Sequence, residues 1–331
     1  MPLPEENPFH PHPLLKNGHL MTVAAALWRR HFALPVAEKR HFQVGDDSKL
    51  LGHCHWQEGK ERGIPLLVLV HGLEGSSESS YMLGIAEQAW HRGFHVIRLN
   101  QRNCGGTEKL TPTLYNSGMS ADYRTVFEEL SAGDGFSSIF FIGYSMGGNL
   151  VTKMAGEFAA AAPSALRGIA AVCPALDLAA CADALERRDN YFYQRHFVAN
   201  LMSRYARKAE LFPERYSRNG FASIRTVREF DDAITAPHFG YRNAQEYYEA
   251  AGAKRVVKAI RVPCLLIAAQ DDPFVPLRAT SASGAQGNPA IVFDTPRYGG
   301  HCGFISDERG NNRFWAEKRV VEFCGEIARR R

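Results

Sequence analysis

Ser145 lies in a setting that could make it a nucleophile. Gly143 and Gly147 flank it in the sequence Gly-Tyr-Ser-Met-Gly, between the apolar run 138–142 and a helix-like stretch at 148–160. A chain that turns from strand to helix at one residue needs such glycines, because Cβ atoms would clash in so tight a turn. The turn exposes the serine hydroxyl and aims the free N–H groups of the helix at the reacting oxygen. The pentapeptide alone also fits an ordinary turn, so the prediction depends on the flanking strand and helix.

A serine hydroxyl needs a base to take its proton and an acid to orient that base. His301 is the predicted base, because it follows the apolar run 291–293 on a glycine-rich loop that can approach another loop closely. The predicted acid is Asp272, which follows the apolar run 263–269. Along the chain the order is therefore serine, acid, histidine, and each follows a predicted strand. This is the order found in enzymes whose serine nucleophile lies on such a strand-to-helix turn.

Two other aspartates remain candidates for the acid. Asp271 directly precedes Asp272, and we expect its side chain to hydrogen-bond the backbone of the loop, a common role for aspartate at a turn. The prolines at 273 and 276 have the spacing that favours Asp272. Asp177 is the third candidate, since it follows the apolar run 168–173.

The oxyanion that forms when a serine attacks a carbonyl carbon needs two hydrogen-bond donors. One predicted donor is the backbone N–H of Met146, directly after the nucleophile. The other is the backbone N–H of Leu73, in the loop that follows the strongly apolar run 65–70. His71 begins this loop, and we expect it to hydrogen-bond the loop backbone and shape the oxyanion site rather than act as the base.

These motifs together resemble one family. They are the segments 71–77 (His-Gly-Leu-Glu-Gly-Ser-Ser), 102–106 (Arg-Asn-Cys-Gly-Gly), 143–148, 271–274 and 299–304, with further similarity at 17–22, 230–232, 239–241 and 247–248. The set resembles the YheT-like branch of the α/β hydrolases, the AB-hydrolase-4 family of esterases and acyltransferases. The resemblance spans nearly the whole chain and implies an ester hydrolase or acyltransferase with Ser145, an acid at Asp271 or Asp272, and His301. Some eukaryotic relatives are membrane-anchored and act on lipid esters. No such anchor is expected in this sequence, so their membrane-bound lipid substrates are not expected to carry over to it.

Apolar runs at regular intervals predict the strands of a mostly parallel sheet. After an expected hairpin (41–44 and 51–56), such runs recur at 66–70, 95–99, 138–142, 170–173, 265–269 and 290–293. Helical stretches such as 81–92 and 121–130 lie between most of them, which predicts an α/β fold with helices on both faces of a doubly wound sheet. With the family resemblance, this indicates an α/β-hydrolase core.

The interval 174–262 contains no predicted strand. We therefore expect the α/β-hydrolase core to comprise 1–173 and 263–331, with a helical cap inserted at 174–262. The aromatic side chains of the cap are expected to wall an acyl pocket over Ser145. Most of its arginines are expected to face solvent; they are Arg187, Arg188, Arg195, Arg204, Arg207 and Arg215.

Composition excludes several classes of protein. The chain has 331 residues, 45% hydrophobic and 22% charged, as is typical of a globular protein that buries a sizeable core. Its net charge is only +4, and no basic and aromatic pattern favours nucleic acid as a partner. The seven cysteines are odd in number and scattered, which indicates reduced thiols. No motif has the spacing of metal ligands, so neither a metal nor another cofactor is predicted.

The N-terminal region predicts a cytoplasmic protein without a transmembrane segment. Residues 1–8 are acidic and proline-rich, unlike the basic start of a signal peptide. The apolar stretch 23–28 is too short to cross a bilayer. We expect this stretch to pack on the core, with peripheral contact at a membrane surface as the lesser alternative.

Together these observations predict a serine carboxylic-ester hydrolase that works through an acyl-enzyme on small-molecule esters. The expected acyl groups are of short to medium chain length, or lipid-like. One alternative is an acyltransferase that uses an alcohol acceptor. Another is a catalytically inactive hydrolase fold that serves as a binding scaffold, which the complete set of site residues disfavours.

Overall fold

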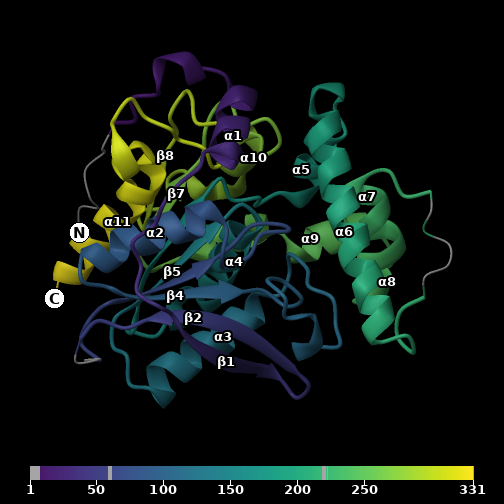
Figure 1. Ribbon diagram of the computed structural model, residues 1–331, viewed down its shortest axis with the longest axis horizontal. Coiled ribbons are helices and arrows are strands. Elements are labelled where there is room, and N and C mark those ends of the chain that lie inside the picture. The colour runs from purple at the N-terminus through teal and green to yellow at the C-terminus, as the bar shows by residue number, and fades with distance from the viewer. Residues whose placement is uncertain (1–7, 59–61, 218–220, 222, 331) are drawn as a thin grey trace.

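The computed structural model describes residues 8–58, 62–217, 221 and 223–330. Its centre is an eight-stranded sheet in the order β1-β2-β4-β3-β5-β6-β7-β8 (Figure 1). β1 and β2 form an antiparallel hairpin, β2 runs antiparallel to β4, and the strands from β4 to β8 in this order are parallel. The strand bounds are β1 Glu38–Gly45, β2 Ser48–His55, β3 Leu66–Val70, β4 His95–Asn100, β5 Ile139–Tyr144, β6 Leu166–Val172, β7 Cys264–Ile267 and β8 Ile291–Asp294.

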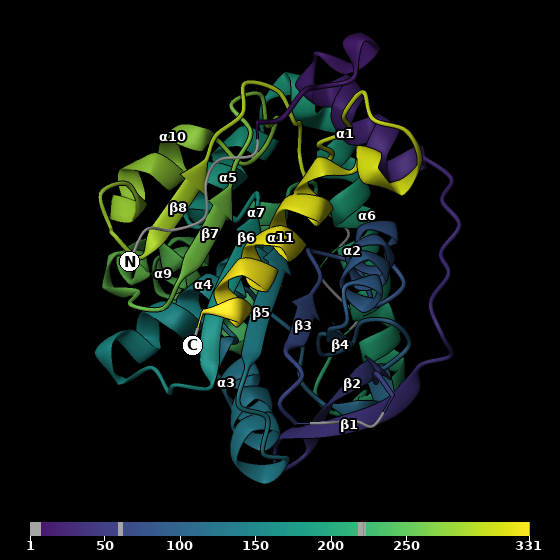
Figure 2. The same cartoon turned by 90° about the vertical axis from the view of Figure 1, so that its left-hand side faces the viewer.

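The parallel strands are apolar at nearly every position because helices cover both faces of the sheet. In β3, Leu66, Val68 and Val70 pack into one apolar cluster, while Leu67 and Leu69 pack into the other. Helices α3 and α4 contribute to the first cluster, and α2 and α11 cover the opposite face (Figure 2). The predicted doubly wound sheet is therefore confirmed. The helices of the core are α1 Gly18–Leu27, α2 Ser80–His91, α3 Ser120–Glu128, α4 Met146–Phe158, α10 Leu277–Thr280 and α11 Trp315–Arg329.

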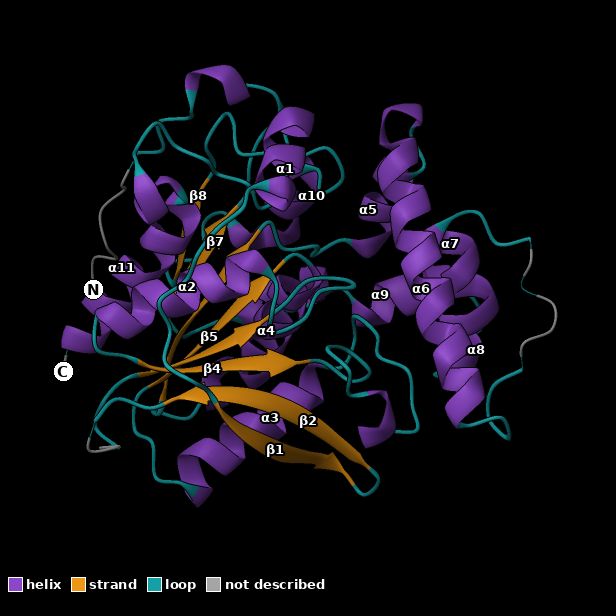
Figure 3. Cartoon of the chain, viewed as in Figure 1, coloured by secondary structure: helices purple, strands orange, loops and turns teal. Residues whose placement is uncertain are grey.

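The elements described between β6 and β7 are all helical. They form a cap at the side of the sheet toward which the parallel strands point (Figure 3). The predicted helical insertion between core strands is therefore confirmed. Near the end of the segment 174–262, however, Ala253, Val257 and Ile260 pack into the core cluster that contains α4. The cap helices are α5 Leu178–Leu185, α6 Tyr191–Leu211, α7 Val227–Phe230, α8 Ala236–His238 and α9 Ala244–Ala251.

Helix α1 packs on the core through Met21, Ala24 and Ala25, but the rest of the apolar stretch 23–28 is exposed, so the predicted packing of that stretch holds only in part. The Asn17 side chain caps its start by accepting a hydrogen bond from the Leu20 N–H at 3.1 Å. Met21 is fully buried in a small cluster with Ile305 and Phe314. Within the described ranges, no helix combines the length and the apolar character needed to cross a bilayer. The acidic segment 1–7 and the terminal Arg331 lie outside the described residues.

Candidate active site

Ser145 stands at the turn between β5 and α4. Its backbone has φ 53° and ψ −117°, a sparsely populated conformation that costs about 1–3 kcal/mol and has to be held by its surroundings. A Cβ atom on Gly143 would lie 2.1 Å from the carbonyl oxygen of Gly147. A Cβ atom on Gly147 would lie 2.4 Å from the carbonyl oxygen of His71. The chain therefore makes the sharp strand-to-helix turn that the sequence predicts, and it can do so only with glycine at both positions.

His301 lies between Ser145 and Asp272. Its Nε2 atom is 2.9 Å from Ser145 Oγ, and its Nδ1 atom is 2.8 Å from Asp272 Oδ2. The second carboxylate oxygen of Asp272 accepts hydrogen bonds from the backbone N–H groups of Phe274 and Val275 at 3.0 and 2.9 Å. These two bonds hold the carboxylate in place, so that it can orient the imidazole. The resulting chain of contacts runs from hydroxyl to imidazole to carboxylate.

The other two candidate acids have different partners. Asp271 Oδ1 accepts a hydrogen bond from the Gly300 N–H at 2.9 Å, the loop-backbone contact that the sequence predicts. Burial raises the pKa of the Asp271 carboxyl above its ordinary value. Asp177 caps α5 by accepting from the Ala180 N–H, and it pairs with Lys254 at 2.6 Å. Of the three aspartates, Asp272 is the one that the structure brings to His301.

The charge of the site favours a protonated imidazole. Burial works to lower the pKa of His301, but the charges of Asp272 and Cys302 and their hydrogen bonds raise it above 6.5. An imidazolium that forms by accepting the serine proton is therefore stabilised by Asp272.

Two thiols lie beside the imidazole. Ligand atoms of Cys173, His301 and Cys302 lie within 4.8 Å of one another. Both ring nitrogens of His301 already contact Ser145 and Asp272. A metal ion held by these three residues would therefore have to displace one of those contacts.

The two predicted oxyanion donors, Leu73 and Met146, are both close to Ser145. Leu73, Ser145 and Met146 line the same pocket. The loop that carries Leu73 comes close to the nucleophile, since a Cβ atom on Gly72 would lie 3.1 Å from Ser145 Cβ. Met146 is the first residue of α4, and the N–H groups of a first turn have no acceptor within their own helix. The backbone thus places both residues where their N–H groups could bind an oxyanion.

His71 supports the loop, as the sequence predicts. Its side chain is fully buried; Nδ1 donates to the carbonyl oxygen of Gly72 at 2.8 Å, and Nε2 accepts from the Gln101 N–H at 3.1 Å. Burial lowers the pKa of His71 to about 4, against the effect of the Gly72 hydrogen bond. The ring is therefore neutral at ordinary pH, and it joins the loop to the end of β4.

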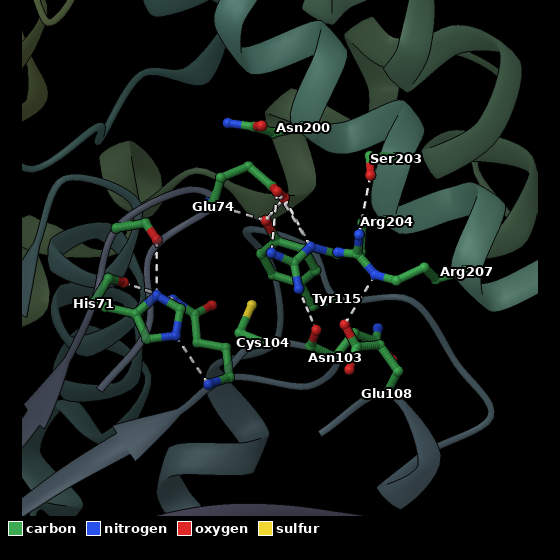
Figure 4. A network of polar contacts seen from close by, with 12 residues as sticks. His71, Glu74, Asn103, Cys104, Glu108, Tyr115, Asn200, Ser203, Arg204 and Arg207 are labelled. Carbon is green, nitrogen blue, oxygen red and sulfur yellow. Dashed lines mark hydrogen bonds and ion pairs between the residues drawn. The ribbon is translucent and has the colours of Figure 1, made fainter. Parts of the chain in front are cut away.

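An ion pair between cap and core fixes the residue after Leu73. Glu74 has φ 58°, and its carboxylate contacts Arg204 of α6, with Nε–Oε1 and Nη2–Oε2 distances of 3.0 Å each (Figure 4). The hydroxyl of Tyr115 donates to Glu74 Oε1 at 2.5 Å. Arg204 also donates to the carbonyl oxygen of Asn103. A side chain of the cap thus holds the backbone beside the predicted oxyanion donor.

Sequence reasoning missed this ion pair. Most of the cap arginines face solvent as predicted, namely Arg187, Arg188, Arg195, Arg207 and Arg215, but Arg204 is buried. The feature of the sequence that could have indicated a buried arginine is Glu74, because a carboxylate in a loop at the edge of a buried site requires a cationic partner. The partner lies 130 residues away in the sequence, and only the folded chain identifies it.

Two cavities meet at Ser145. The first, of about 110 Å³, lies between cap and core, and Phe197, Leu201 and Phe230 are among its mostly apolar walls. It lies where the sequence predicts an acyl pocket. The second, of about 540 Å³, is a groove between α1 and α6 that reaches both Ser145 and His301, and Tyr193 lines it. The nucleophile is therefore accessible from two sides.

Comparisons with known proteins agree with this fold. Residues 65–308 match the family described as alpha/beta hydrolase fold. The chain is 30% identical to the Escherichia coli protein named "Putative esterase YheT", over 93% of this chain and 90% of that protein. It is 29% identical to phospholipase ABHD3 of Mus musculus over 73% of this chain, and it spans only 58% of that longer protein. The esterase Pf2001 of Pyrococcus furiosus superposes with a TM-score of 0.55 at 14% identity, over 90% of this chain and 99% of that one.

Proposed function

Because the chain belongs to the alpha/beta hydrolase fold family and to its YheT-like branch, we propose that it is a serine carboxylic-ester hydrolase working through an acyl-enzyme. Two of its relatives are named as an esterase and a phospholipase, both of which hydrolyse esters. The observation that carries the finer proposal is the chain of hydrogen bonds from Ser145 through His301 to Asp272.

The proposed first half-reaction makes an ester of Ser145. Nε2 of His301 accepts the hydroxyl proton as Oγ attacks the carbonyl carbon of the substrate. Asp272 stabilises the imidazolium through Nδ1–H. The carbonyl oxygen becomes an oxyanion and accepts hydrogen bonds from the N–H groups of Leu73 and Met146. Collapse of this intermediate breaks the bond to the leaving alcohol, which takes the proton from His301.

The proposed second half-reaction releases the acid. A water molecule gives its proton to His301 and attacks the acyl carbon, and the same two donors bind the second oxyanion. When that intermediate collapses, the proton returns from His301 to the Ser145 oxygen. The enzyme is thereby restored, with one ester and one water converted into one acid and one alcohol.

The two cavities suggest how a substrate lies. We place the acyl chain in the apolar cavity under the cap, because each buried methylene contributes about 0.8 kcal/mol. The alcohol then occupies the groove between α1 and α6, which reaches the same serine.

Because residues from Ala253 onward pack with the core, we take the functional cap to run from 174 to about 252.

A fluorophosphonate probe and a p-nitrophenyl ester test the nucleophile together. The probe should label Ser145 in the native protein, and Ser145→Ala should lose the label and about a millionfold in kcat. A comparable melting temperature in the variant excludes unfolding as the cause. Labelling at another serine, or full activity in Ser145→Ala, would show that the assignment is wrong. A native protein that neither reacts with the probe nor hydrolyses esters would instead be a binding scaffold.

An acyltransferase is the second candidate, and the groove favours it because it could hold an alcohol acceptor next to the acyl-enzyme. Adding a primary alcohol to the ester assay distinguishes the two. A hydrolase gives mainly free acid whatever the alcohol concentration. A transferase gives a new ester in proportion to the alcohol, while release of p-nitrophenol stays constant or rises.

A further inference from the structure

Helix α1 is apolar on the side that faces solvent as well as on the side that faces the core. Met21 is fully buried, yet Leu20 is 57% exposed and Leu27 is 75% exposed. Surface helices of globular proteins normally carry polar side chains on their outer face. The outer face of α1 therefore has the composition of a surface that contacts something apolar.

More apolar side chains extend this face across the entrance of the groove. Leu14 lies just before α1 and is 79% exposed, and at the start of α6 Phe192 is 82% exposed. The rings of His19 in α1 and Tyr193 in α6 stack at 5.8 Å, so the two elements meet. In Figure 1 α1 lies in the upper part of the view, and α6 runs downward on its right. We call this set the apolar rim: Leu14, Leu20, Val23, Leu27, Tyr191 and Phe192.

The apolar rim borders the groove that leads to Ser145. Val23 and Leu27 on one side and Tyr193 and Phe197 on the other line the groove of about 540 Å³ whose floor includes Ser145. A molecule that covers the rim would therefore cover the route by which the groove opens to the outside.

The charges around the rim are mostly basic, although Glu186 and Asp189, just before α6, are exposed acids, and Asp189 pairs with Arg187. Residues 8–37 contain no aspartate or glutamate, but they contain Lys16, Arg29 and Arg30. Arg30 is buried against Glu317, whereas Lys16 and Arg29 are exposed. At the start of α6, Arg188 and Arg195 are also exposed. Apolar side chains with basic neighbours are the combination that binds the surface of an anionic bilayer.

We propose that the apolar rim docks on the surface of an anionic lipid bilayer, with the groove open toward the lipid. Leucine and phenylalanine side chains enter the outer part of the bilayer, and the exposed basic residues contact lipid phosphates. A second copy of the chain fits this surface less well, because pairing two rims would bring like charges together. The docking itself does not depend on the proposed function. Only one part of the proposal rests on that function, namely that an ester entering from the lipid reaches Ser145.

Vesicle co-sedimentation tests the docking without any turnover. The probes are vesicles of phosphatidylcholine and vesicles of phosphatidylcholine with phosphatidylglycerol, with the Ser145→Ala protein as the ligand. We expect binding to the anionic vesicles, weaker binding to the neutral ones, and a loss of affinity at high salt. The double variant Leu20→Gln with Phe192→Gln changes one side chain from each element, and its affinity should fall by about tenfold.

Leu211→Gln is the matched control, because Leu211 is an exposed leucine at the far end of α6. It should bind vesicles as the parent does, and all variants should keep the parent melting temperature. No binding to either kind of vesicle, or equal binding by the double variant and its parent, would overturn the proposal. So would a dimer in light scattering that the double variant abolishes. Hydrolysis of a soluble butyrate ester by the wild-type protein is measured separately. The docking can therefore be judged even if the esterase proposal fails.

Discussion

At the residue scale, the site depends on a distinction between two adjacent carboxylates. Asp272 contacts His301, while Asp271 contacts the Gly300 N–H. Successive side chains leave the backbone in different directions, so neighbours in the sequence reach different partners. Substitution of each by asparagine preserves size, removes the charge and replaces one acceptor oxygen by an N–H donor, which makes the pair a matched test.

Asp272→Asn should lower kcat by about four orders of magnitude, because an amide leaves His301 in the wrong tautomer. Asp271→Asn should keep most of the activity and act mainly on stability. Steady-state kinetics and thermal melts of both variants provide the measurement. If Asp271→Asn is the inactive one, the acid is Asp271 and the assignment is wrong by one residue.

The pH dependence of kcat/KM gives a second test of Asp272. His301 acts as a base only when neutral, so activity should rise with pH through the pKa of His301. Burial works to lower this pKa, but Asp272 is among the groups that raise it above 6.5, so the midpoint for the native protein should lie above pH 6.5. Asp272→Asn removes the negative charge and should move the midpoint of its residual activity to lower pH. An unchanged midpoint would show that Asp272 does not act on His301.

At the element scale, helix α6 belongs to both the cap and the active site. Through Arg204 it holds the Glu74 loop, and through Phe197 and Leu201 it lines the cavity under the cap. The position of the cap is thus coupled to the position of the Leu73 N–H. Two arginines on this helix, Arg204 and Arg207, allow the coupling to be measured.

Arg204→Gln should destabilise the protein by about 3–5 kcal/mol, because it leaves the buried Glu74 carboxylate without its cation. The side chains of this pair are 9% and 6% exposed. If the Leu73 N–H is an oxyanion donor as proposed, Arg204→Gln should also lower kcat more than it changes KM, since such a donor acts on the transition state more than on the bound substrate. Arg207→Gln removes an ion pair with Glu108 whose arginine is 47% exposed, and it should cost no more than about 1 kcal/mol.

Thermal melts and kinetics on a soluble ester measure both arginine variants. Adding Glu74→Gln to Arg204→Gln removes the unpaired charge and should recover part of the stability. Equal losses in Arg204→Gln and Arg207→Gln would mean that the buried pair has no special role. A loss of stability with unchanged kcat would mean that the pair is purely structural.

The cavity under the cap should select acyl chains by length. Values of kcat/KM for p-nitrophenyl esters from acetate to laurate should rise and then fall, because the cavity has an end. Leu201→Trp fills part of the cavity and should move the optimum to shorter chains. Leu211→Trp makes the same change at an exposed site of the same helix and should leave the profile as it was. A profile that is highest for acetate in every protein would exclude an acyl-binding role for this cavity.

At the scale of the whole molecule, the chain brings three distant regions to one serine. The sheet carries Ser145 and the loops of Leu73, Asp272 and His301, the insertion after β6 provides one cavity, and α1 provides a wall of the other. The backbone N–H of His301 also donates to Thr22 Oγ1 at 2.8 Å, so α1 holds the histidine loop directly. The sheet and its loops alone would lack both the cap wall and this support from α1.

The sequence by itself determined the strands, the cap and the turn at Ser145. These features depend on local patterns: apolar runs specify buried strands, glycines at 143 and 147 permit the turn, and the strand-free interval specifies an insertion. It also placed Ser145, an aspartate pair and His301 in order at strand ends. Parallel strands bring such ends to one edge, so the proximity of these residues followed from the order alone.

Only the tertiary structure decided which aspartate reaches His301, where Arg204 lies, and that α1 has an apolar outer face. Each of these depends on contacts between residues far apart in the sequence. A turn of one residue more or less would exchange the roles of Asp271 and Asp272, and local pattern does not resolve so small a difference. Burial of Arg204 requires Glu74, 130 residues away, and exposure of Leu20 and Leu27 depends on what the rest of the chain leaves uncovered.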